Sequence, residues 1–423
     1  MQKSYFDFEK FFLNFESNIS ACLNNKDVKE FLVAYSGGVD STALLYLDNL
    51  LAKKNNVSIR AVHINHNLSK ESNEWEKHCE KVCIEFKIPI KTKNINIVIS
   101  KGDSIEERAR EERYKSIYQL ISNGTMLMTA HHADDQAETL LNQLFRGAGS
   151  KGMSAMPKIK SIKKHAYHIR PFLNISKTEI NNFINYLNLE YIQDLSNYNI
   201  NYSRNFIRKE IMPVIKRKWP SCTLTISRAA FNLAESAKLN EDLALIDIDN
   251  YLHEDVNKIK TAVRELKRHR FNNIIRFWIK KNNFRMPSLE QINSIYTNIL
   301  NASDSKVAFF SCSEYEIRKY SDYLEIMKPL KSHDPSKLYK WKYNENLVIP
   351  DLGINIPWGK LEEKLGCKLL EDAEVRFRMS GKNINLGSSK TVKDYMREAK
   401  IPHWKRNRVL LIFVNKDLRV IWE

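Results

Sequence analysis

The sequence of 423 residues predicts an α/β domain with a doubly wound parallel sheet, followed by a helical domain and a small α+β domain. Between Phe31 and Ala130, short apolar strands alternate with longer helices, which is the pattern of βαβ units. Residues 221–250 contain little Gly or Pro and are typical of one long helix. Short strands return after residue 375. We therefore expect domains at 1–220, 221–340 and 341–423.

The first domain begins with an amphipathic helix over about 5–25, whose phenylalanine stripe faces a core. Strands are then expected at 31–35, 57–66, from residue 88 and at 125–130. Helices are expected from 39 to about 53, at 71–86 and at 104–122. The stretch 151–170 is basic, and we expect it to be irregular. Ser176 and Glu179 form a capping box that begins a further helix.

The rest of the chain has weaker signals. Residues 263–281 repeat apolar positions at helical spacing, and 315–317 with 323–326 have the character of a hairpin. Residues 331–360 are expected to form a linker or light strands. The last module is expected as a strand at 375–378, a loop at 381–389, a helix at 390–400 and strands at 408–415 and 418–422.

Charge is the strongest bulk signal, because the formal net charge is +17. Such a chain favours a polyanionic partner, since Lys and Arg release counterions from phosphates. The six cysteines are scattered without a Cys-x-x-Cys pair, which argues against a zinc ribbon and for a reducing cytosol. No apolar run is long enough for a membrane helix. We expect a cytoplasmic protein with no membrane partner, either a monomer or a homodimer.

The string from Ser36 to Ser41, Ser-Gly-Gly-Val-Asp-Ser, follows an apolar strand and opens a helix. Glycines allow the backbone to approach a phosphate, and the first N–H groups of the helix favour an anion. No lysine follows the glycines, so this is not a Gly-Lys-Ser/Thr nucleotide loop. A carboxylate at Asp40 beside phosphates suggests a bridging Mg²⁺, and the alternative is that Asp40 or Ser41 is only a helix cap. The expected ATP contacts are Ser36, Gly37, Gly38, Val39, Asp40, Ser41 and His63.

A second polar string, His-His-x-Asp-Asp-x-x-Glu, spans residues 131–138 after the strand at 125–130. Asp135 and Glu138 are three residues apart and share a helix face. Two carboxylates there can hold a second Mg²⁺ or the amino groups of a cationic substrate. Zinc is not expected, because adjacent histidines rarely both reach one metal. Whether Asp134 or Asp135 faces the cleft stays open.

Arginines accompany both strings. Arg110 and Arg113, with Tyr114, lie on a helix that should face the same cleft, and Arg146 stands in a glycine-rich turn suited to phosphate. Arg204 and Arg208 can reach an RNA backbone or a pyrophosphate. A structural ion pair is the alternative for each of these arginines.

Taken in order, the strings at 36–41, 104–114, 131–139, 145–153, 170–173 and 194–213 resemble those of the bacterial tRNA(Ile)-lysidine synthetases. These are ATP pyrophosphatases with a phosphate-binding PP-loop on a Rossmann-like sheet. The resemblance is dense in the first domain, loose in the middle and moderate from Val375 to Arg406. One departure is Arg-Pro-Phe-Leu at 170–173, where two leucines would be expected after the proline; size and apolarity are kept.

The resemblance implies a ligase that adenylates C2 of the wobble cytidine of tRNA(Ile) with a CAU anticodon, using ATP and Mg²⁺. The ε-amine of L-lysine then displaces AMP to give lysidine, which switches codon reading from AUG to AUA. It also implies that Asp40 binds Mg²⁺, that Arg113 contacts the activated intermediate, and that Asp135 and Glu138 bind lysine; these four are the expected catalytic residues. The expected tRNA contacts are Arg146, Arg204, Arg208, Arg376, Arg378, Lys405 and Arg406.

Other functions fit parts of the pattern. A tRNA thiolation enzyme on the same scaffold would need paired cysteines or an iron–sulfur cluster, and the cysteine spacing argues against both. A non-catalytic RNA-binding protein would not need Asp40, Asp135 and Glu138. An ATP pyrophosphatase acting on a small molecule would have less use for two basic C-terminal domains.

Overall fold

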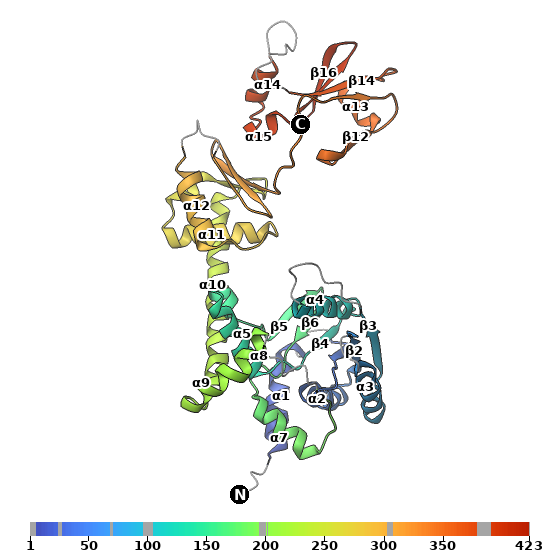
Figure 1. The fold of residues 1–423 in the computed structure, drawn as a ribbon, viewed down its shortest axis with the longest axis vertical. Coiled ribbons are helices and arrows are strands. Elements are labelled where there is room, and N and C mark those ends of the chain that lie inside the picture. The colour runs from blue at the N-terminus through green and yellow to red at the C-terminus, as the bar shows by residue number, and fades with distance from the viewer. Residues whose placement is uncertain are drawn as a thin grey trace. The chain divides into compact units, whose positions relative to one another are not determined.

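The computed structural model describes residues 6–23, 28–67, 71–95, 105–193, 200, 202–302, 308–378 and 391–422. The chain divides into two compact units, Met1–Leu239 and Asn240–Glu423, which are treated separately below (Figure 1). None of the helices within the described ranges is long and apolar enough to cross a membrane. The loop predicted at 381–389 lies outside the described residues.

A six-stranded sheet with the order β3-β2-β1-β4-β6-β5 organises the first unit (Figure 1). Neighbouring strands are parallel except for β5, which is antiparallel to β6 at the edge. The predicted parallel sheet is thus confirmed. The strands are β1 (Glu30–Ala34), β2 (Ser58–Asn65), β3 (Ile90–Asn94), β4 (Thr125–Met128), β5 (Ile159–Lys163) and β6 (Ala166–Ile169).

The prediction that residues 151–170 are irregular is wrong. The segment continues the short helix α6 (Ser150–Met153) and then forms the hairpin β5–β6, which turns at His165 with a φ of 57°. The apolar alternation of β5 is weak, and the lysines along it make the strand hard to recognise from the sequence. What makes β6 a strand is its parallel pairing with the buried β4, a contact that no local pattern reveals.

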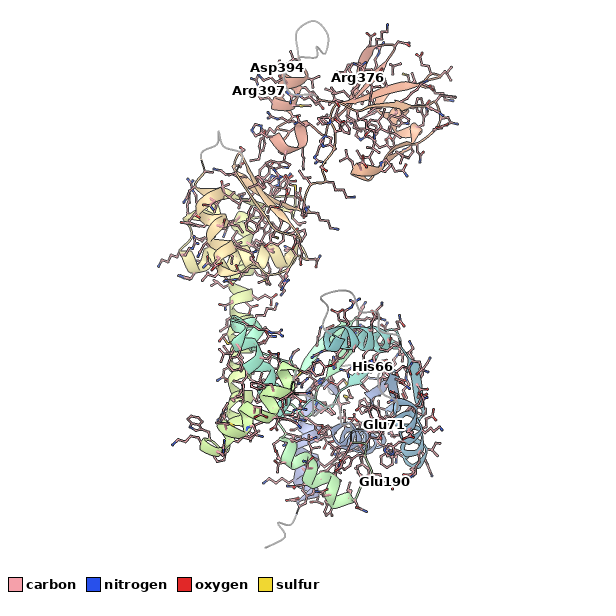
Figure 2. The ribbon with its side chains drawn as sticks, in the orientation of Figure 1. His66, Glu71, Glu190, Arg376, Asp394 and Arg397 are labelled. Atoms are coloured by element: carbon pink, nitrogen blue, oxygen red, sulfur yellow. The ribbon has the colours of Figure 1, made fainter. Side chains whose placement is uncertain are left out.

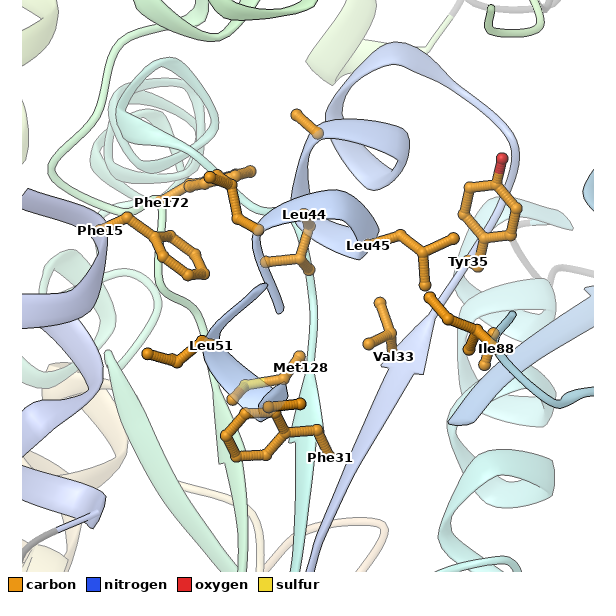
Figure 3. Close-up of a cluster of buried hydrophobic side chains, with 14 of the residues drawn as sticks. Phe15, Phe31, Val33, Tyr35, Leu44, Leu45, Leu51, Ile88, Met128 and Phe172 are labelled. Atoms are coloured by element: carbon orange, nitrogen blue, oxygen red, sulfur yellow. The ribbon is translucent and has the colours of Figure 1, made fainter. Parts of the chain in front are cut away.

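Helices cover both faces of the sheet, as expected for a doubly wound fold. Phe31 and Val33 of β1 point into a core shared with α1 (Phe8–Leu23), α2 (Val39–Asn55), α3 (Ser72–Phe86) and α7 (Lys177–Leu187) (Figure 3). Leu32 points to the opposite face and packs against Ile117 of α4 (Ile105–Tyr118). The two-residue period of the strand thus separates the two cores.

The strand order changes direction at β1. The chain runs outward from β1 to β2 and β3, and then returns to place β4 on the other side of β1. At such a reversal the loops after the two central strands diverge to opposite faces and leave a crevice at the carboxyl ends, where ligands of open α/β sheets bind. The loops after β1 and β4 therefore meet at the expected ligand site.

A helical layer ends the first unit. It contains α5 (Ala133–Phe145), α8 (Ser203–Phe206), the π-helical turn η2 (Ile207–Ile211), α9 (Met212–Lys218) and the first part of α10 (Cys222–Tyr251). Ala137 of α5 packs on Ile207 and Met212, which joins this layer to the sheet domain. The long helix predicted at 221–250 is confirmed as α10, and residue 240 within it begins the second unit.

The described part of the second unit contains further hydrophobic cores. The first surrounds Trp278 and combines α11 (Arg268–Lys281), α12 (Leu289–Ser294) and the turns η3 (Thr261–Glu265) and η4 (Ile295–Leu300) with a sheet. That sheet has the order β7-β10-β9-β8, from β7 (Lys258–Lys260), β8 (Phe309–Ser311), β9 (Glu316–Tyr320) and β10 (Tyr323–Met327). The predicted hairpin is β9–β10, and the helix predicted from 263 begins at Arg268 after a 3-10 turn.

The last core surrounds Trp341 and Val375 in an antiparallel sheet with the order β11-β14-β15-β16. Its strands are β11 (Leu338–Trp341), β14 (Ala373–Phe377), β15 (Leu410–Val414) and β16 (Asp417–Trp422). The remaining elements are β12 (Leu347–Ile349), η5 (Pro350–Leu352), β13 (Ile354–Ile356), α13 (Trp358–Leu365), α14 (Val392–Glu398) and α15 (His403–Arg406). The strands and the helix predicted after residue 375 are confirmed.

Candidate active site

The loop from Ser36 to Gly38 joins β1 to α2 and has the geometry of an anion-binding turn. Gly37 has a φ of +79°, and a Cβ built there would lie 2.4 Å from Cδ1 of Ile192. Gly37 O accepts a hydrogen bond of 2.8 Å from the Ile192 N–H, which holds the turn in place. Only glycine satisfies both the backbone angle and the lack of space.

Two hydroxyl groups close the loop. Ser36 Oγ lies 3.0 Å from Ser41 Oγ, and Ser41 donates to Gly38 O at 3.0 Å. Val39 and Asp40 form the first turn of α2, whose free N–H groups and dipole favour a negative ligand. The sequence-predicted residues 36–41 therefore come together as a compact site that fits phosphate oxygens.

Asp40 is paired with a residue that the sequence analysis missed. Lys177, the first residue of α7, places its Nζ 2.6 Å from Asp40 Oδ1. Its backbone N–H donates to Asp134 Oδ2 at 2.9 Å. The pair joins positions 137 residues apart, so no local pattern indicated it.

His63 lies beneath the loop and is 5% exposed. Its Nδ1 is 3.0 Å from Tyr35 O and 3.4 Å from Cys79 Sγ. Burial lowers the pKa of His63, so the ring is neutral at neutral pH. The contact to a backbone carbonyl requires a proton on Nδ1, which leaves Nε2 as an acceptor.

The two aspartates of α5 have different surroundings. His132 caps the helix by accepting from the Asp135 N–H at 3.3 Å, while Asp135 Oδ2 accepts from the His132 N–H at 3.1 Å. Asp134 points elsewhere and accepts from Lys216 Nζ at 2.6 Å and from the backbone of Lys177. Asp134 thus anchors α7 and α9 to α5, and Asp135 is the residue that joins Glu138.

Asp135 and Glu138 form a cluster with Arg204 and Arg208. Both arginines donate to Asp135 Oδ1, at 2.8 and 2.9 Å. Arg204 Nε lies 3.1 Å from Glu138 Oε2, and Arg208 Nε lies 2.7 Å from Glu138 Oε1. The sequence favoured RNA or pyrophosphate as partners of these arginines, with a structural ion pair as the alternative, and here their direct partners are the two carboxylates.

Charge balance explains why the carboxyl group of Asp135 stays ionised in a buried place. Burial is the largest effect and opposes ionisation of Asp135, but His132, Arg204 and Arg208 together hold the pKa of its carboxyl below the usual range. Burial also opposes the charge on Arg208, and Glu138 and Asp135 nevertheless raise its pKa. The cluster is four paired charges rather than two free carboxylates.

A relay of buried hydrogen bonds, from Arg170 through His168 and Thr129 to His131, connects the sheet to this site. Arg170 Nη2 lies 3.3 Å from His168 Nδ1, His168 Nε2 lies 2.8 Å from Thr129 Oγ1, and that hydroxyl lies 3.0 Å from His131 Nδ1. A guanidinium only donates, so His168 accepts at Nδ1 and donates from Nε2. The Thr129 hydroxyl then donates to His131, which leaves the proton of His131 on Nε2.

Neither histidine of the relay carries a charge at neutral pH. Burial and then the charge of Arg170 lower the pKa of His168 to about 2. Burial lowers the pKa of His131 well below its ordinary value, with Arg170, Arg204 and Arg113 acting in the same direction against Asp135. The relay was not foreseen because His168 and Arg170 belong to the segment expected to be irregular.

Arg113 extends from α4, with its guanidinium 5.4 Å from the Tyr114 ring centroid, and Arg110 is 5.8 Å from the same ring. Burial, opposed in part by Tyr114, lowers the pKa of Arg113. It still carries its charge at neutral pH. Tyr114 also lies 5.5 Å from His168, which places this pair of arginines beside the relay.

The residues expected to contact tRNA are dispersed. Arg146 is exposed at the end of α5 and lines a hollow of about 490 Å³ with Phe145 and Phe206. In the second unit, Arg376 lies on β14 (Figure 2). It pairs with Glu374, and its guanidinium lies 4.8 Å from the Phe413 ring centroid. Arg378 is half-buried just after β14.

Lys405 and Arg406 lie on α15. Lys405 Nζ is 2.7 Å from Glu325 Oε1 of β10, and Arg406 Nε donates to Ile401 O at 2.9 Å. Both therefore have intramolecular partners here, and contact with RNA stays a prediction for them and for the other basic residues.

Three family models match successive parts of the chain. They are described as a PP-loop domain, over residues 12–215, a TilS substrate binding domain, over 261–325, and a TilS substrate C-terminal domain, over 373–422. The first ends within α9, and the second and third both fall within the second unit.

Curated relatives match nearly the whole chain, and each of the following is named tRNA(Ile)-lysidine synthase. That of Coxiella burnetii is 35% identical over 92% of this chain and 87% of its own. That of Buchnera aphidicola subsp. Schizaphis graminum is 36% identical, over 94% and 89%. That of Wigglesworthia glossinidia brevipalpis is 38% identical, over 77% and 84%.

Among solved structures, the U34-tRNA thiolase NcsA from Methanococcus maripaludis matches 54% of this chain and 79% of its own, at 19% identity and a TM-score of 0.46. A likeness at this level carries no argument about function.

Proposed function

The chain belongs to the tRNA(Ile)-lysidine synthase family, and we propose that it converts the wobble cytidine (position 34) of tRNA(Ile) with a CAU anticodon to lysidine. ATP first adenylates the C2 oxygen of the base and releases pyrophosphate. The ε-amine of free L-lysine then attacks C2, a proton leaves the amine, and AMP departs with the oxygen. A cytoplasmic protein would meet all three substrates.

The observation that carries this proposal is the position of His132 between the two halves of the site. Its Nε2 lies 3.8 Å from Asp40 Oδ2 and 3.5 Å from Asp135 Oδ2. Asp40 of the anion-binding loop and Asp135 of the carboxylate pair therefore both lie close to one histidine nitrogen. A reaction that joins a phosphate-activated base to an amine needs these two sites side by side.

The loop fits the triphosphate on its own geometry. The positive φ of Gly37 turns the chain tightly where Ile192 leaves no room for a side chain, and Ser36 and Ser41 add hydroxyl groups. Mg²⁺ would neutralise the leaving pyrophosphate and draw its ligands from Asp40, phosphate oxygens and water. In this proposal the loop holds the β- and γ-phosphates while the α-phosphorus faces the base.

The carboxylates of Asp135 and Glu138 are suited to bind the ammonium groups of lysine. Arg204 and Arg208 occupy them in this structure, so an incoming lysine has to share or displace these contacts. The arginines released from the carboxylates would face the adenylated base and its phosphate. Arg113, half-buried on α4, adds a further cation for that intermediate.

The target base has to leave its stack to reach the α-phosphorus, as in other enzymes that modify a base. Arg146, Arg376, Arg378, Lys405 and Arg406 would contribute phosphate contacts that position the tRNA without reading its sequence. In this proposal Arg204 and Arg208 act mainly at the reaction centre, and contact with tRNA is secondary for them.

The decisive experiment incubates the purified protein with ATP, radiolabelled lysine and a panel of tRNA transcripts. Lysine should enter only tRNA(Ile) with a CAU anticodon, with one AMP and one pyrophosphate released for each lysine. Elongator tRNA(Met), which has the same anticodon, and tRNA(Ile) with uridine at position 34 are the matched controls. Labelling with sulfur instead of lysine would favour a thiolation enzyme, and binding without AMP release would favour a non-catalytic RNA-binding protein.

A further inference from the structure

Both the backbone and the side chain of Lys177 are held in place beside the phosphate loop. Its backbone N–H is fixed to Asp134 Oδ2 at 2.9 Å, and Asp134 is itself fixed by Lys216 Nζ at 2.6 Å. Ser176 caps α7 directly before it, through a capping box with Glu179. With its backbone held, the Lys177 side chain extends to the first turn of α2 and ends 2.6 Å from Asp40 Oδ1.

The pair is only partly shielded from solvent, with side-chain exposures of 33% for Lys177 and 28% for Asp40. A surface pair of this kind contributes little stability by itself. The pair matters because of its position. Asp40 belongs to the phosphate loop sequence, and its expected role is to bind a divalent cation. The ammonium of Lys177 takes the position such a cation would need.

We propose that Lys177 contacts the triphosphate and reaches it by leaving Asp40 when the metal arrives. The inference rests on the proposed ATP site, not on the identity of the tRNA. A divalent cation on Asp40 repels the ammonium and removes its counter-ion. The nearest new negative charge is then the phosphate chain, which the anion-binding turn places beside the same helix end.

This arrangement makes Lys177 act in opposite directions on two ligands. Without nucleotide it competes with the metal for Asp40, so its charge weakens metal binding. With nucleotide it adds a donor to the phosphates, so its charge strengthens ATP binding. Metal and ATP therefore bind cooperatively, because the metal frees Lys177 to contact the phosphates, and the phosphates draw Lys177 away from Asp40.

The test compares Lys177→Met, which keeps the length of the side chain and removes its charge, with Lys177→Arg, which keeps the charge. Binding of Mn²⁺ without nucleotide is measured by electron paramagnetic resonance, and binding of ATP with Mg²⁺ by equilibrium dialysis. Lys177→Met should bind Mn²⁺ at least threefold more tightly and ATP at least tenfold more weakly. Lys177→Arg should stay within threefold of the wild type for both ligands.

Lys54→Met is the matched control, because Lys54 lies in the last turn of α2, at the far end from the phosphate loop, and pairs with Glu16 at 2.7 Å. It should leave both affinities within twofold of the wild type. The proposal is wrong if Lys177→Met changes neither affinity, or weakens both, as loss of loop structure would. It is also wrong if Asp40→Asn leaves Mn²⁺ binding of the otherwise wild-type chain unchanged.

The measurements need neither tRNA nor lysine, so they separate this inference from the proposed reaction. A chain that shows the opposite shifts but never incorporates lysine would keep the role of Lys177 and lose the lysidine assignment. A chain that makes lysidine without the opposite shifts would keep the lysidine assignment and lose the role of Lys177.

Discussion

Arg208 holds Glu138 in a bidentate ion pair: Nε lies 2.7 Å from Oε1 and Nη2 lies 2.8 Å from Oε2. Glu138 is 2% exposed at its side chain, whereas Arg208 is 37% exposed. A planar guanidinium fits a carboxylate in this way and an ammonium does not. The buried acid thus depends on a partner that reaches in from solvent.

Removing that partner should cost stability because it leaves a buried carboxylate with fewer donors. We expect Arg208→Met to lower the unfolding free energy of the N-terminal unit by about 1–3 kcal/mol, at the low end of the range for buried pairs because Arg208 is partly exposed. Glu138→Gln combined with Arg208→Met should lose less than the sum of the single changes. Denaturant unfolding measures the cycle, and strict additivity would contradict the coupling.

Replacement of Asp40 should abolish the reaction and leave RNA binding nearly unchanged. Asp40→Ala removes the expected metal ligand and leaves the Lys177 ammonium without its carboxylate, while the basic residues of the second unit are untouched. Pyrophosphate release in the presence of tRNA and ATP should fall at least 100-fold, and tRNA affinity by filter binding should stay within about threefold. Release at the wild-type rate would refute the metal role.

Gly37 should tolerate no side chain. In Gly37→Ala the new Cβ would meet Ile192 Cδ1 at 2.4 Å and the φ of +79° would be strained. ATP affinity should fall at least tenfold, and stability by about 1–3 kcal/mol. Adding Ile192→Ala relieves only the steric part, so ATP binding should recover in part. Full recovery would show that the backbone angle is unimportant.

His168 should make stability depend on pH. The pKa of His168 is about 2 in the folded chain, and an unfolded histidine titrates near about 6.5. The unfolded chain therefore binds a proton that the folded chain does not, and the stability present above pH 6.5 is lost as the pH falls.

The slope amounts to at most about 1.4 kcal/mol per pH unit for one histidine. Urea unfolding at pH 7.5, 6 and 5 should give a steeper loss for the wild type than for His168→Gln. The exposed His269→Gln is the control, with the wild-type slope. Equal slopes for all three would show that His168 is protonated in the folded chain.

Arg376 and Arg378 should act on RNA through phosphates. Replacing both with Gln should weaken binding of specific and non-specific tRNAs alike and reduce the slope of log K against log salt by up to about 2. The control is Lys360→Gln. Lys360 is exposed on α13 and pairs with Glu363, so its loss should leave the slope unchanged. An unchanged slope in the double variant would show that β14 does not touch RNA.

Much of the fold could be predicted because its signals are local. The strand before Ser36, the glycine turn and the helix after it follow each other directly, and so do the capping box at Ser176 and the unbroken helix α10. Such features are decided by neighbours a few residues away. Hairpin β5–β6 was missed because its inner strand is stabilised by β4 and not by its own composition.

The chemistry-bearing residues were mostly identified, but their partners were not. For Arg204 and Arg208 the sequence left RNA, pyrophosphate and an ion pair open, and the structure pairs them with carboxylates 66 to 73 residues away. Lys177 and the relay from Arg170 to His131 left no trace in the sequence, because ion pairs and shared protons depend on distance in space alone.

By itself, the sequence determined the order of strands and helices, the phosphate loop and the residue types that this chemistry needs, since backbone angles and apolar periodicity are properties of adjacent residues. Only the tertiary structure decided which charge neutralises which. The reversal of strand order at β1 brings the loops after β1 and β4 together, and the return of α7 and α8 then supplies the cations that pair with Asp40 and with the buried Asp135.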